Sequence, residues 1–178
     1  MIKRRSLIVI CYAFMALIII VLIFAFAYPF YKWSTMNPVP MNIWIVDKTV
    51  PNTDYREHKG LMWVLNNDKI VNPKTGEAYR YDSDYYGFFP IDKDHYDIKE
   101  LVAQDQQPDL IYLADTYGVY KDDYLSVNKE GSRSELLYGG LNDKELALIK
   151  KNLSGGNTII GEFNTASAPT NIANREQL

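Results

Sequence analysis

The sequence predicts an α/β protein in which one N-terminal membrane helix precedes a single domain with a short, mostly parallel sheet and helices on both of its faces. Three observations lead to this prediction. A long uncharged apolar run lies near the N-terminus. Further along, short runs rich in β-branched residues end in polar residues, as buried parallel strands do. Amphipathic runs alternate with them, which is typical of α/β domains.

The N-terminal apolar run is long enough to span a bilayer. No charged residue lies between Arg5 and Lys32, and a helix of about 20 residues rises ~30 Å, the thickness of the hydrocarbon core. Lys3, Arg4 and Arg5 precede the run, whereas only Lys32 follows it. The positive-inside rule therefore predicts a cytoplasmic N-terminus and a single-pass signal anchor in the cell membrane, with the domain outside the cytoplasm.

The boundaries that we expect are a cytoplasmic tail over 1–5, a transmembrane helix over 6–31, a linker over 32–41 and an extracytoplasmic domain over 42–178. Tyr28, Tyr31 and Trp33 suit an aromatic belt at the outer interface. Cleavage as a signal peptide is the alternative, because Ala25-Phe26-Ala27 fits the A-x-A pattern. The apolar core is longer than the ~7–15 residues usual for such peptides.

The charge of the exported part excludes nucleic acid as a partner. Four of the 19 Lys and Arg residues precede Asn37, whereas all 22 Asp and Glu residues follow it. The domain is therefore strongly acidic, and nucleic-acid binding needs a cationic face. Attraction to anionic lipid is disfavoured for the same reason.

The only cysteine, Cys11, lies in the apolar run. The domain therefore has no disulfide, no thiolate metal ligand and no cysteine nucleophile. No P-loop, no G-x-S-x-G elbow and no G-x-G-x-x-G motif after a strand is present. We predict no cofactor from these patterns.

Five segments carry the clear secondary-structure signals. Apolar runs predict buried strands at 42–47, 109–115 and 157–161, and amphipathic patterns predict helices at 55–66 and 141–153. These strands and helices alternate along the chain, which predicts a parallel sheet.

The ends and connections of these elements are less regular. Thr53 or Asp54 is the expected N-cap of the first domain helix, and Asn142 that of the second. Residues 67–90 predict an edge strand and a long loop, and residues 91–104 a helix.

A family resemblance becomes visible in the second half of the domain. The segments DLIYLAD (109–115), LNDKELALIKKNL (141–153) and SGGNTIIGEF (154–163) resemble the class I glutamine amidotransferase-like superfamily, including its ThuA-like and other non-amidotransferase branches. The match covers Asp109–Glu162, with weaker support from 43–66, and it implies a flavodoxin-like three-layer domain. Members that hydrolyse glutamine use a cysteine nucleophile and a distant histidine. Neither is in place here, so the resemblance implies the fold and no glutaminase chemistry.

The candidate ligand site follows from the strand ends, because ligands of open α/β sheets bind outside the carboxyl ends of the strands. Carboxylates from three strands, Asp47, Asp115 and Glu162, could hold a divalent cation through oxygen ligands. In the alternative, each carboxylate caps the loop that follows it and no metal binds. We predict this second arrangement, with no metal site. The full set of predicted ligand-binding residues is Asp47, Lys48, Asp115, Thr116, Tyr117, Glu162 and Asn164.

Two other groups of residues are candidates for function. His58 could act as a general base beside the same crevice, or pack structurally; His95 is a weaker candidate. Nine tyrosines between Tyr79 and Tyr124 suit sugar rings or a protein partner, or they pack loops over the sheet; they include Tyr85, Tyr86, Tyr117, Tyr120 and Tyr124. The loop Glu162–Thr170 could cradle an anion or be an ordinary connection.

Two function classes follow. The first is a non-catalytic, membrane-anchored binding or interaction module of the bacterial cell envelope, with a protein or an envelope glycan as partner. The second is a cell-envelope hydrolase that uses the strand-end carboxylates Asp47, Asp115 and Glu162, with or without a metal. The candidate catalytic residues are His58, Asp115 and Glu162. The sheet ends soon after its third clear strand, which leaves an exposed edge. We therefore expect either the N-terminal part of a longer protein or a product that needs a partner.

Overall fold

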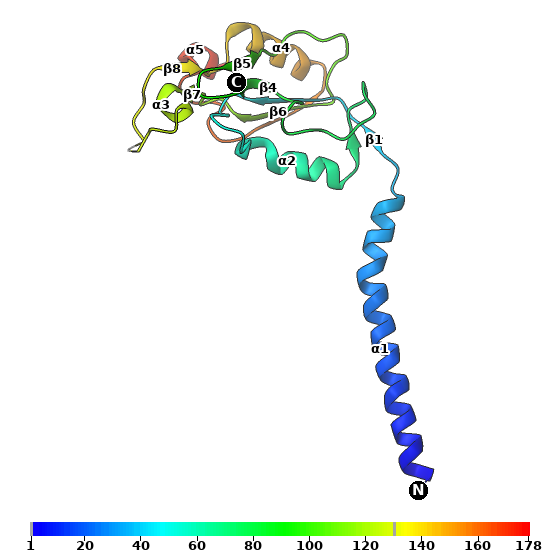
Figure 1. Cartoon of the computed structure of the whole chain (residues 1–178). Coiled ribbons are helices and arrows are strands. Elements are labelled where there is room, and N and C mark those ends of the chain that lie inside the picture. Colours follow the sequence, from blue (N-terminus) through cyan, green and yellow to red (C-terminus); the bar gives the residue numbers. More distant parts are fainter. Residues whose placement is uncertain (1, 130) are drawn as a thin grey trace. The chain divides into compact units, whose positions relative to one another are not determined.

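The structure, a computed structural model, describes residues 2–129 and 131–178. The chain forms two compact units, Met1–Asn37 and Pro38–Leu178. The first unit is a single helix and the second is an α/β domain, as the colours of Figure 1 show. The predicted α/β class with a long N-terminal apolar helix is confirmed.

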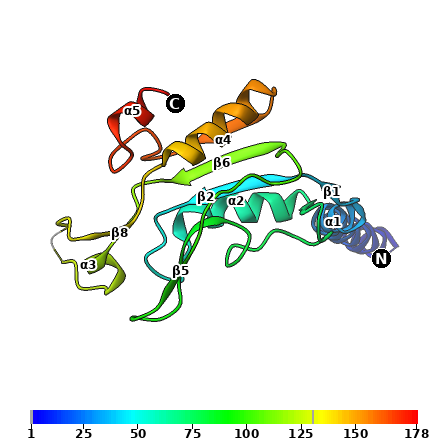
Figure 2. The same cartoon turned by 90° about the horizontal axis from the view of Figure 1, so that it is seen from above.

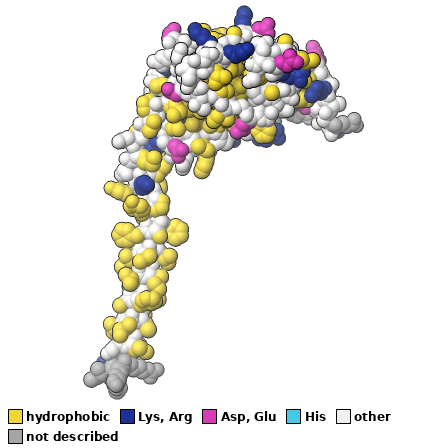
Figure 3. All heavy atoms as spheres, turned by 180° about the vertical axis from the view of Figure 1, so that it is seen from behind, with side chains coloured by type: hydrophobic (Ala, Val, Ile, Leu, Met, Phe, Trp, Pro, Cys, Tyr) yellow, Lys and Arg dark blue, Asp and Glu magenta, His cyan; other side chains and the backbone are white. Residues whose placement is uncertain are grey.

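Helix α1 covers Ile2–Thr35, and its segment Arg5–Thr35 is long and apolar enough to cross a membrane. Apolar side chains cover the visible side of this helix in Figure 3. Helix α1 is longer than the expected transmembrane span of 6–31: it continues past Pro29 and ends at Thr35, before Pro38, which disfavours helix in the residue that precedes it.

The expected linker over 32–41 is shorter than predicted. Its first residues belong to α1, and Val39–Pro40 form strand β1, which pairs in parallel with β3 (Ile70–Val71) of the domain. Residues 36–38 alone therefore connect the helix to the domain.

The central sheet of the domain has five strands in the order β5-β4-β2-β6-β9. All neighbouring pairs are parallel except β4 and β5, which form an antiparallel pair. Their bounds are β2 Ile43–Asp47, β4 Tyr86–Pro90, β5 Tyr96–Lys99, β6 Leu110–Asp115 and β9 Thr158–Gly161. The three predicted strands are β2, β6 and β9, and all three are confirmed.

Two helices cover opposite faces of this sheet, as Figures 1 and 2 show. Ile43 and Ile45 of β2 pack in one core cluster with α2 (Arg56–Asn67). Trp44 and Val46 point the other way and pack in a second cluster with α4 (Asp143–Ser154). This follows from the period of two in a strand, which sends successive side chains to opposite faces.

One prediction between β2 and β6 is wrong. Residues 91–104 contain strand β5 instead of a helix, because Tyr96 and Ile98 alternate with polar residues and the backbone pairs with β4. The range 67–90, expected to hold an edge strand and a long loop, contains β3, which lies in a two-stranded sheet, and β4, which lies inside the central sheet between β2 and β5. Gly87 of β4 has φ 150°, and a Cβ there would lie 1.6 Å from the Asp47 carbonyl oxygen. Only glycine lets β4 approach β2 so closely.

The two main helices begin differently. Asn142 caps α4 as predicted: its side chain accepts from the backbone N–H groups of Lys144 and Glu145, and Glu145 completes a capping box. The expected caps of α2, Thr53 and Asp54, are wrong. Tyr55 occupies the N-cap position in a left-handed conformation, with no side-chain cap hydrogen bond.

Small elements gather beyond the carboxyl ends of the central strands. Strands β7 (Val119–Tyr120) and β8 (Leu136–Tyr138) form an antiparallel pair beside the short helix α3 (Lys121–Tyr124), and Figure 2 shows them past the end of β6. Helix α5 (Ile172–Arg175) contacts the start of α4 through the Asn174 side chain.

Candidate functional site

The candidate site lies where the strand order of the sheet reverses. From β2 the chain passes through α2 to β4 on one side, whereas β6 and β9 lie on the other. The helices α2 and α4 diverge from this point to opposite faces, which opens a crevice outside the carboxyl ends of β2 and β6. Open α/β sheets bind their ligands at such a switch point.

Asp47, the last residue of β2, points into the core. Its side chain is fully buried: Oδ2 lies 2.5 Å from Nδ1 of His58, and Oδ1 accepts from the Thr49 backbone N–H at 2.9 Å. Both carboxylate oxygens are therefore engaged.

His58 is equally closed to solvent. Its Nε2 lies 2.7 Å from the carbonyl oxygen of Tyr81, and its ring is 4.5 Å from that of Tyr85. Both ring nitrogens of His58 are therefore engaged, one with the Asp47 carboxylate and the other with the Tyr81 carbonyl oxygen. No nitrogen of His58 is free to act as a general base in the crevice, which favours the structural interpretation.

Lys48 also turns inward, to the opposite face of the sheet. Its Nζ lies 2.6 Å from both Oε2 of Glu145 and the carbonyl oxygen of Gly140, and 4.8 Å from the ring centre of Tyr138. Burial lowers the pKa of Lys48 below its usual value, and the charge of Glu145 opposes that shift. The pair joins the end of β2 to the first turn of α4.

The end of β6 is arranged differently, because the carboxylate of Asp115, a residue that is only 5% exposed, lines the crevice. Asp115 Oδ1 accepts from the Tyr117 backbone N–H at 2.6 Å, and the Asn164 side-chain amide donates to Asp115 Oδ2 at 3.2 Å. Thr116 is buried, and its hydroxyl donates to the Asn164 carbonyl oxygen at 3.0 Å. These bonds hold the carboxylate of Asp115 in place.

Glu162 does not join the other two carboxylates. It is exposed beyond β9, two strands away from β2. Burial, and then the carboxylate of Glu162 acting as a hydrogen-bond partner, raise the pKa of the Tyr112 hydroxyl. Within residues 2–129 and 131–178, no group of three or more His, Cys, Asp and Glu side chains is placed to hold a metal ion. The three-carboxylate cation site considered from the sequence is therefore not formed.

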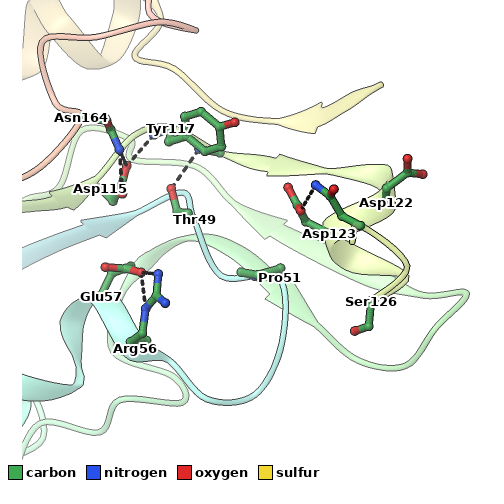
Figure 4. A pocket seen from close by; sticks show the side chains of 12 residues that line it. Thr49, Pro51, Arg56, Glu57, Asp115, Tyr117, Asp122, Asp123, Ser126 and Asn164 are labelled. Carbon is green, nitrogen blue, oxygen red and sulfur yellow. Dashed lines mark hydrogen bonds and ion pairs between the residues drawn. The ribbon is translucent and has the colours of Figure 1, made fainter. Parts of the chain in front are cut away.

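A cavity of about 590 Å³ occupies the crevice. Of the predicted ligand-binding residues, it brings together Asp115, Tyr117 and Asn164; Asp47, Lys48, Thr116 and Glu162 do not line it. Figure 4 shows Arg56 and Glu57 of α2 on one side of the cavity, opposite Asp115 and Asn164. The full lining is Thr49, Pro51, Arg56, Glu57, Asp115, Tyr117, Gly118, Asp122, Asp123, Ser126, Asn128 and Asn164.

Acidic groups dominate the charge of the cavity. Arg56, the one cationic side chain among the described lining residues, binds Oε1 of Glu57 through Nε at 2.8 Å and Nη2 at 2.6 Å. The Glu57 side chain is only 10% exposed, whereas that of Arg56 is 86% exposed. With Glu57 paired to Arg56, the carboxylates of Asp115, Asp122 and Asp123 remain uncompensated by a basic lining residue.

Sequence reasoning missed α3 as part of the site. It placed the start of α2 beside the crevice through His58, but it gave no role to Glu57. The clue available for Glu57 was its place in the first turn of a helix that follows a strand, which points that turn toward the strand ends. For Asp122, Asp123 and Asn128 no periodic signal was present, because a four-residue helix is too short to show one.

The tyrosines divide between core and surface. Tyr85 is fully buried, stacks on Phe89 and donates to the Phe88 carbonyl oxygen. Tyr117 lines the cavity, with its ring 5.0 Å from that of Tyr120. The packing use considered from the sequence therefore occurs in Tyr85, whereas Tyr117 is placed at the cavity.

The remaining candidates have local structural partners. The exposed His95 contacts the side chain of Asp92 in the turn before β5. In the loop after β9, Thr170 is buried and its hydroxyl accepts from the Leu141 backbone N–H at 3.0 Å. That loop therefore packs against the start of α4.

Comparison with protein-family models, with curated proteins and with solved structures finds nothing that matches this chain.

Proposed function

We propose that the chain is a non-catalytic, membrane-anchored ligand-binding module of the bacterial cell envelope, and that its cavity binds a hydroxyl-rich ligand such as an envelope glycan. The observation that carries this proposal is the cavity at the switch point, in which Asp115 is oriented by Tyr117 and Asn164. Fixed carboxylates accept hydrogen bonds from hydroxyl groups, and an aromatic side chain such as Tyr117 offers an apolar face to a sugar ring.

The composition of the lining favours binding over catalysis. Among the described residues, the cavity is lined by no histidine, cysteine or lysine. The buried His58 and Lys48 are both engaged in ion pairs away from it. A hydroxyl nucleophile such as Ser126 would therefore have no histidine or lysine base beside it.

Anchoring and orientation rest on α1 and on the charges at its ends. Three basic residues precede the apolar segment and Lys32 follows it, so we infer a cytoplasmic N-terminus and an extracytoplasmic domain. An engineered cysteine in the domain, in a Cys11→Ala background, tests this on intact cells. Labelling by an impermeant thiol reagent is expected, and protection until lysis would contradict the orientation.

We also propose that the domain is flavodoxin-like and related to the class I glutamine amidotransferase-like superfamily. The parallel strands β4-β2-β6-β9 support this, because their order, 2-1-3-4 in chain sequence, matches the first four strands of the flavodoxin arrangement. A profile built from homologous sequences tests the relationship: it should align Asp109–Glu162 with that superfamily, and failure to do so would contradict it.

Titration of the full chain in detergent micelles with envelope glycan fragments tests the binding function. Asp115→Asn and Glu57→Gln should each weaken binding by roughly tenfold or more, because a hydrogen bond to a charged group contributes about 1.5–3 kcal/mol. Asp105→Asn, at an exposed aspartate outside the cavity, is the matched control and should leave binding unchanged. Equal binding by all variants would contradict the proposed site, and release of shortened glycans would indicate the hydrolase instead.

A further inference from the structure

The outer face of α2 carries an unusually exposed aromatic residue. Trp63 is 70% exposed and its neighbour Val64 is 46% exposed. The inner face of the same helix is fully packed, with Met62 and Leu65 buried in the core. Tryptophan is a side chain that proteins commonly place where water meets lipid, because its ring is apolar and its N–H is polar.

The chain enters the domain next to this helix. Strand β1 begins at Val39, which is 48% exposed, and pairs with β3. Strand β3 follows α2 after two residues and packs against it. The entry point of the domain and the carboxyl end of α2 therefore belong to one corner of the domain.

The length of the connection limits how far that corner can be from the bilayer. Helix α1 ends at Thr35 and β1 begins at Val39, so at most about 14 Å of extended chain separates them. The polar region of each leaflet is itself roughly 5–8 Å thick. A surface tethered so closely meets lipid at a high effective concentration. The lipid-bound state is therefore populated even if the contact of the aromatic side chain with lipid is weak.

Charge does not provide the attraction. The domain is strongly acidic overall, and Arg56 on α2 is paired with Glu57. Lys59 is stacked 4.9 Å from the ring centre of Tyr81. A contact made by this face therefore depends on apolar and aromatic burial, and it needs neither low salt nor anionic lipid.

We propose that the outer face of α2, with Trp63 and Val64, docks onto the outer leaflet of the membrane that holds the chain. The proposal rests on the membrane anchor of the proposed function. The cavity is formed at the amino end of α2, by Arg56 and Glu57, whereas β3 adjoins its carboxyl end. Docking through the middle and carboxyl end of α2 leaves the cavity open to ligand.

The test uses the full chain in vesicles of neutral lipid, with Cys11→Ala and one new cysteine that carries an environment-sensitive fluorophore. Val64→Cys reports on the proposed surface. Leu153→Cys is the matched control, because Leu153 is an apolar residue, 52% exposed, on the helix that covers the opposite face of the sheet. We expect brominated lipids to quench the label at 64 at least about twofold more than the label at 153. Adding Trp63→Ser should remove that difference, and high salt should not.

The possible results separate the two proposals. Extraction of the protein by an alkaline carbonate wash means that the anchor itself fails. Retention in the membrane with equal, weak quenching at both positions overturns the docking surface alone. Quenching that disappears at high salt overturns it too, since it indicates attraction by headgroup charge. The fluorescence of the label at 64 could also shift more at higher protein density without being quenched by brominated lipid. That result overturns the membrane-docking proposal and indicates that a second copy of the chain covers this surface.

Discussion

Strands β2 and β6 are neighbours in the sheet and both end in an aspartate, yet the two strand ends serve different purposes. Asp47 is enclosed by the imidazole of His58, whereas Asp115 lines the cavity. The difference lies in what the next element supplies. Helix α2 brings the buried ring of His58 to Asp47, whereas the loop after β9 brings the side-chain amide of Asn164 to Asp115. A carboxylate at a strand end is thus structural or available for binding according to its neighbour.

The largest effect that we expect tests this contrast directly. Asp47→Ala leaves Nδ1 of His58 buried without its partner, so the free energy of unfolding should fall by about 3 kcal/mol. Asp115→Ala removes hydrogen bonds at the edge of a cavity and should cost only about 1 kcal/mol, while ligand binding is lost. Urea unfolding of the full chain in detergent, followed by fluorescence, measures both. Equal destabilisation would refute the proposed division between the two strand ends.

The residues after each aspartate extend the comparison, since Lys48 is buried in an ion pair and Thr116 donates only a neutral hydrogen bond. Lys48→Met should lower the free energy of unfolding by about 3 kcal/mol, because it leaves Glu145 charged and buried. The cost stays at the low end of the usual range, since Glu145 keeps its bond to the Asn142 backbone N–H. The double variant Lys48→Met/Glu145→Gln should recover most of the loss, and a double variant as unstable as Lys48→Met would contradict this account.

Sequence patterns were sufficient for the parts of the fold that are periodic and buried. Strand β2 was predicted because it is an apolar run that ends in an aspartate. Helix α4 was predicted because Asn142 is a good N-cap and Leu146 and Ile149 belong to an apolar stripe. Strand β5 was not predicted, because only two of its four exposed residues are apolar. Its pairing partner, β4, lies in a stretch of sequence without a clear period. Local signals do not report long-range pairing.

The cavity lining was predicted only in part. The switch-point argument grouped Asp115, Tyr117 and Asn164, and these three residues line one cavity. It could not tell that Asp47 and Lys48 turn inward, because their partners, His58 and Glu145, lie 11 and 97 residues further along the chain. Which of two equivalent strand ends is open depends on such tertiary contacts.

Helices α2 and α4 offer a smaller contrast in how they begin. Asn142→Ala should lower the free energy of unfolding by about 1 kcal/mol, because it removes a side-chain acceptor for two backbone N–H groups. Asp54→Ala, before α2, should change it by less, since Tyr55 is the N-cap there and no side chain caps the helix. Thermal unfolding of the two variants compares them, and a larger loss for Asp54→Ala would show that the start of α2 is capped after all.

The smallest effect concerns alkaline pH and the ring beside Lys48. Burial raises the pKa values of Tyr85, Tyr112 and Tyr138 above 10. Below pH 10 these groups are protonated in both states, but at higher pH the unfolded chain loses their protons first, so stability falls as pH rises. Lys48 acts in the opposite direction, because its pKa is lowered and its unfavourable burial is relieved as pH rises toward 10.5.

Tyr138→Phe separates these contributions, because Lys48 is present in both proteins. The buried hydroxyl of Tyr138 has no hydrogen-bond partner among the described residues, so at pH 7 the variant should be as stable as the wild type or more stable, by up to about 1 kcal/mol. Its advantage should widen between pH 7 and pH 10.5, since the wild type alone pays to keep that hydroxyl protonated while the unfolded chain ionises. Urea midpoints at the two pH values measure the difference. A gap that stays constant would mean that Tyr138 ionises as easily in the folded domain as in the unfolded chain, and that the ring beside Lys48 is open to water.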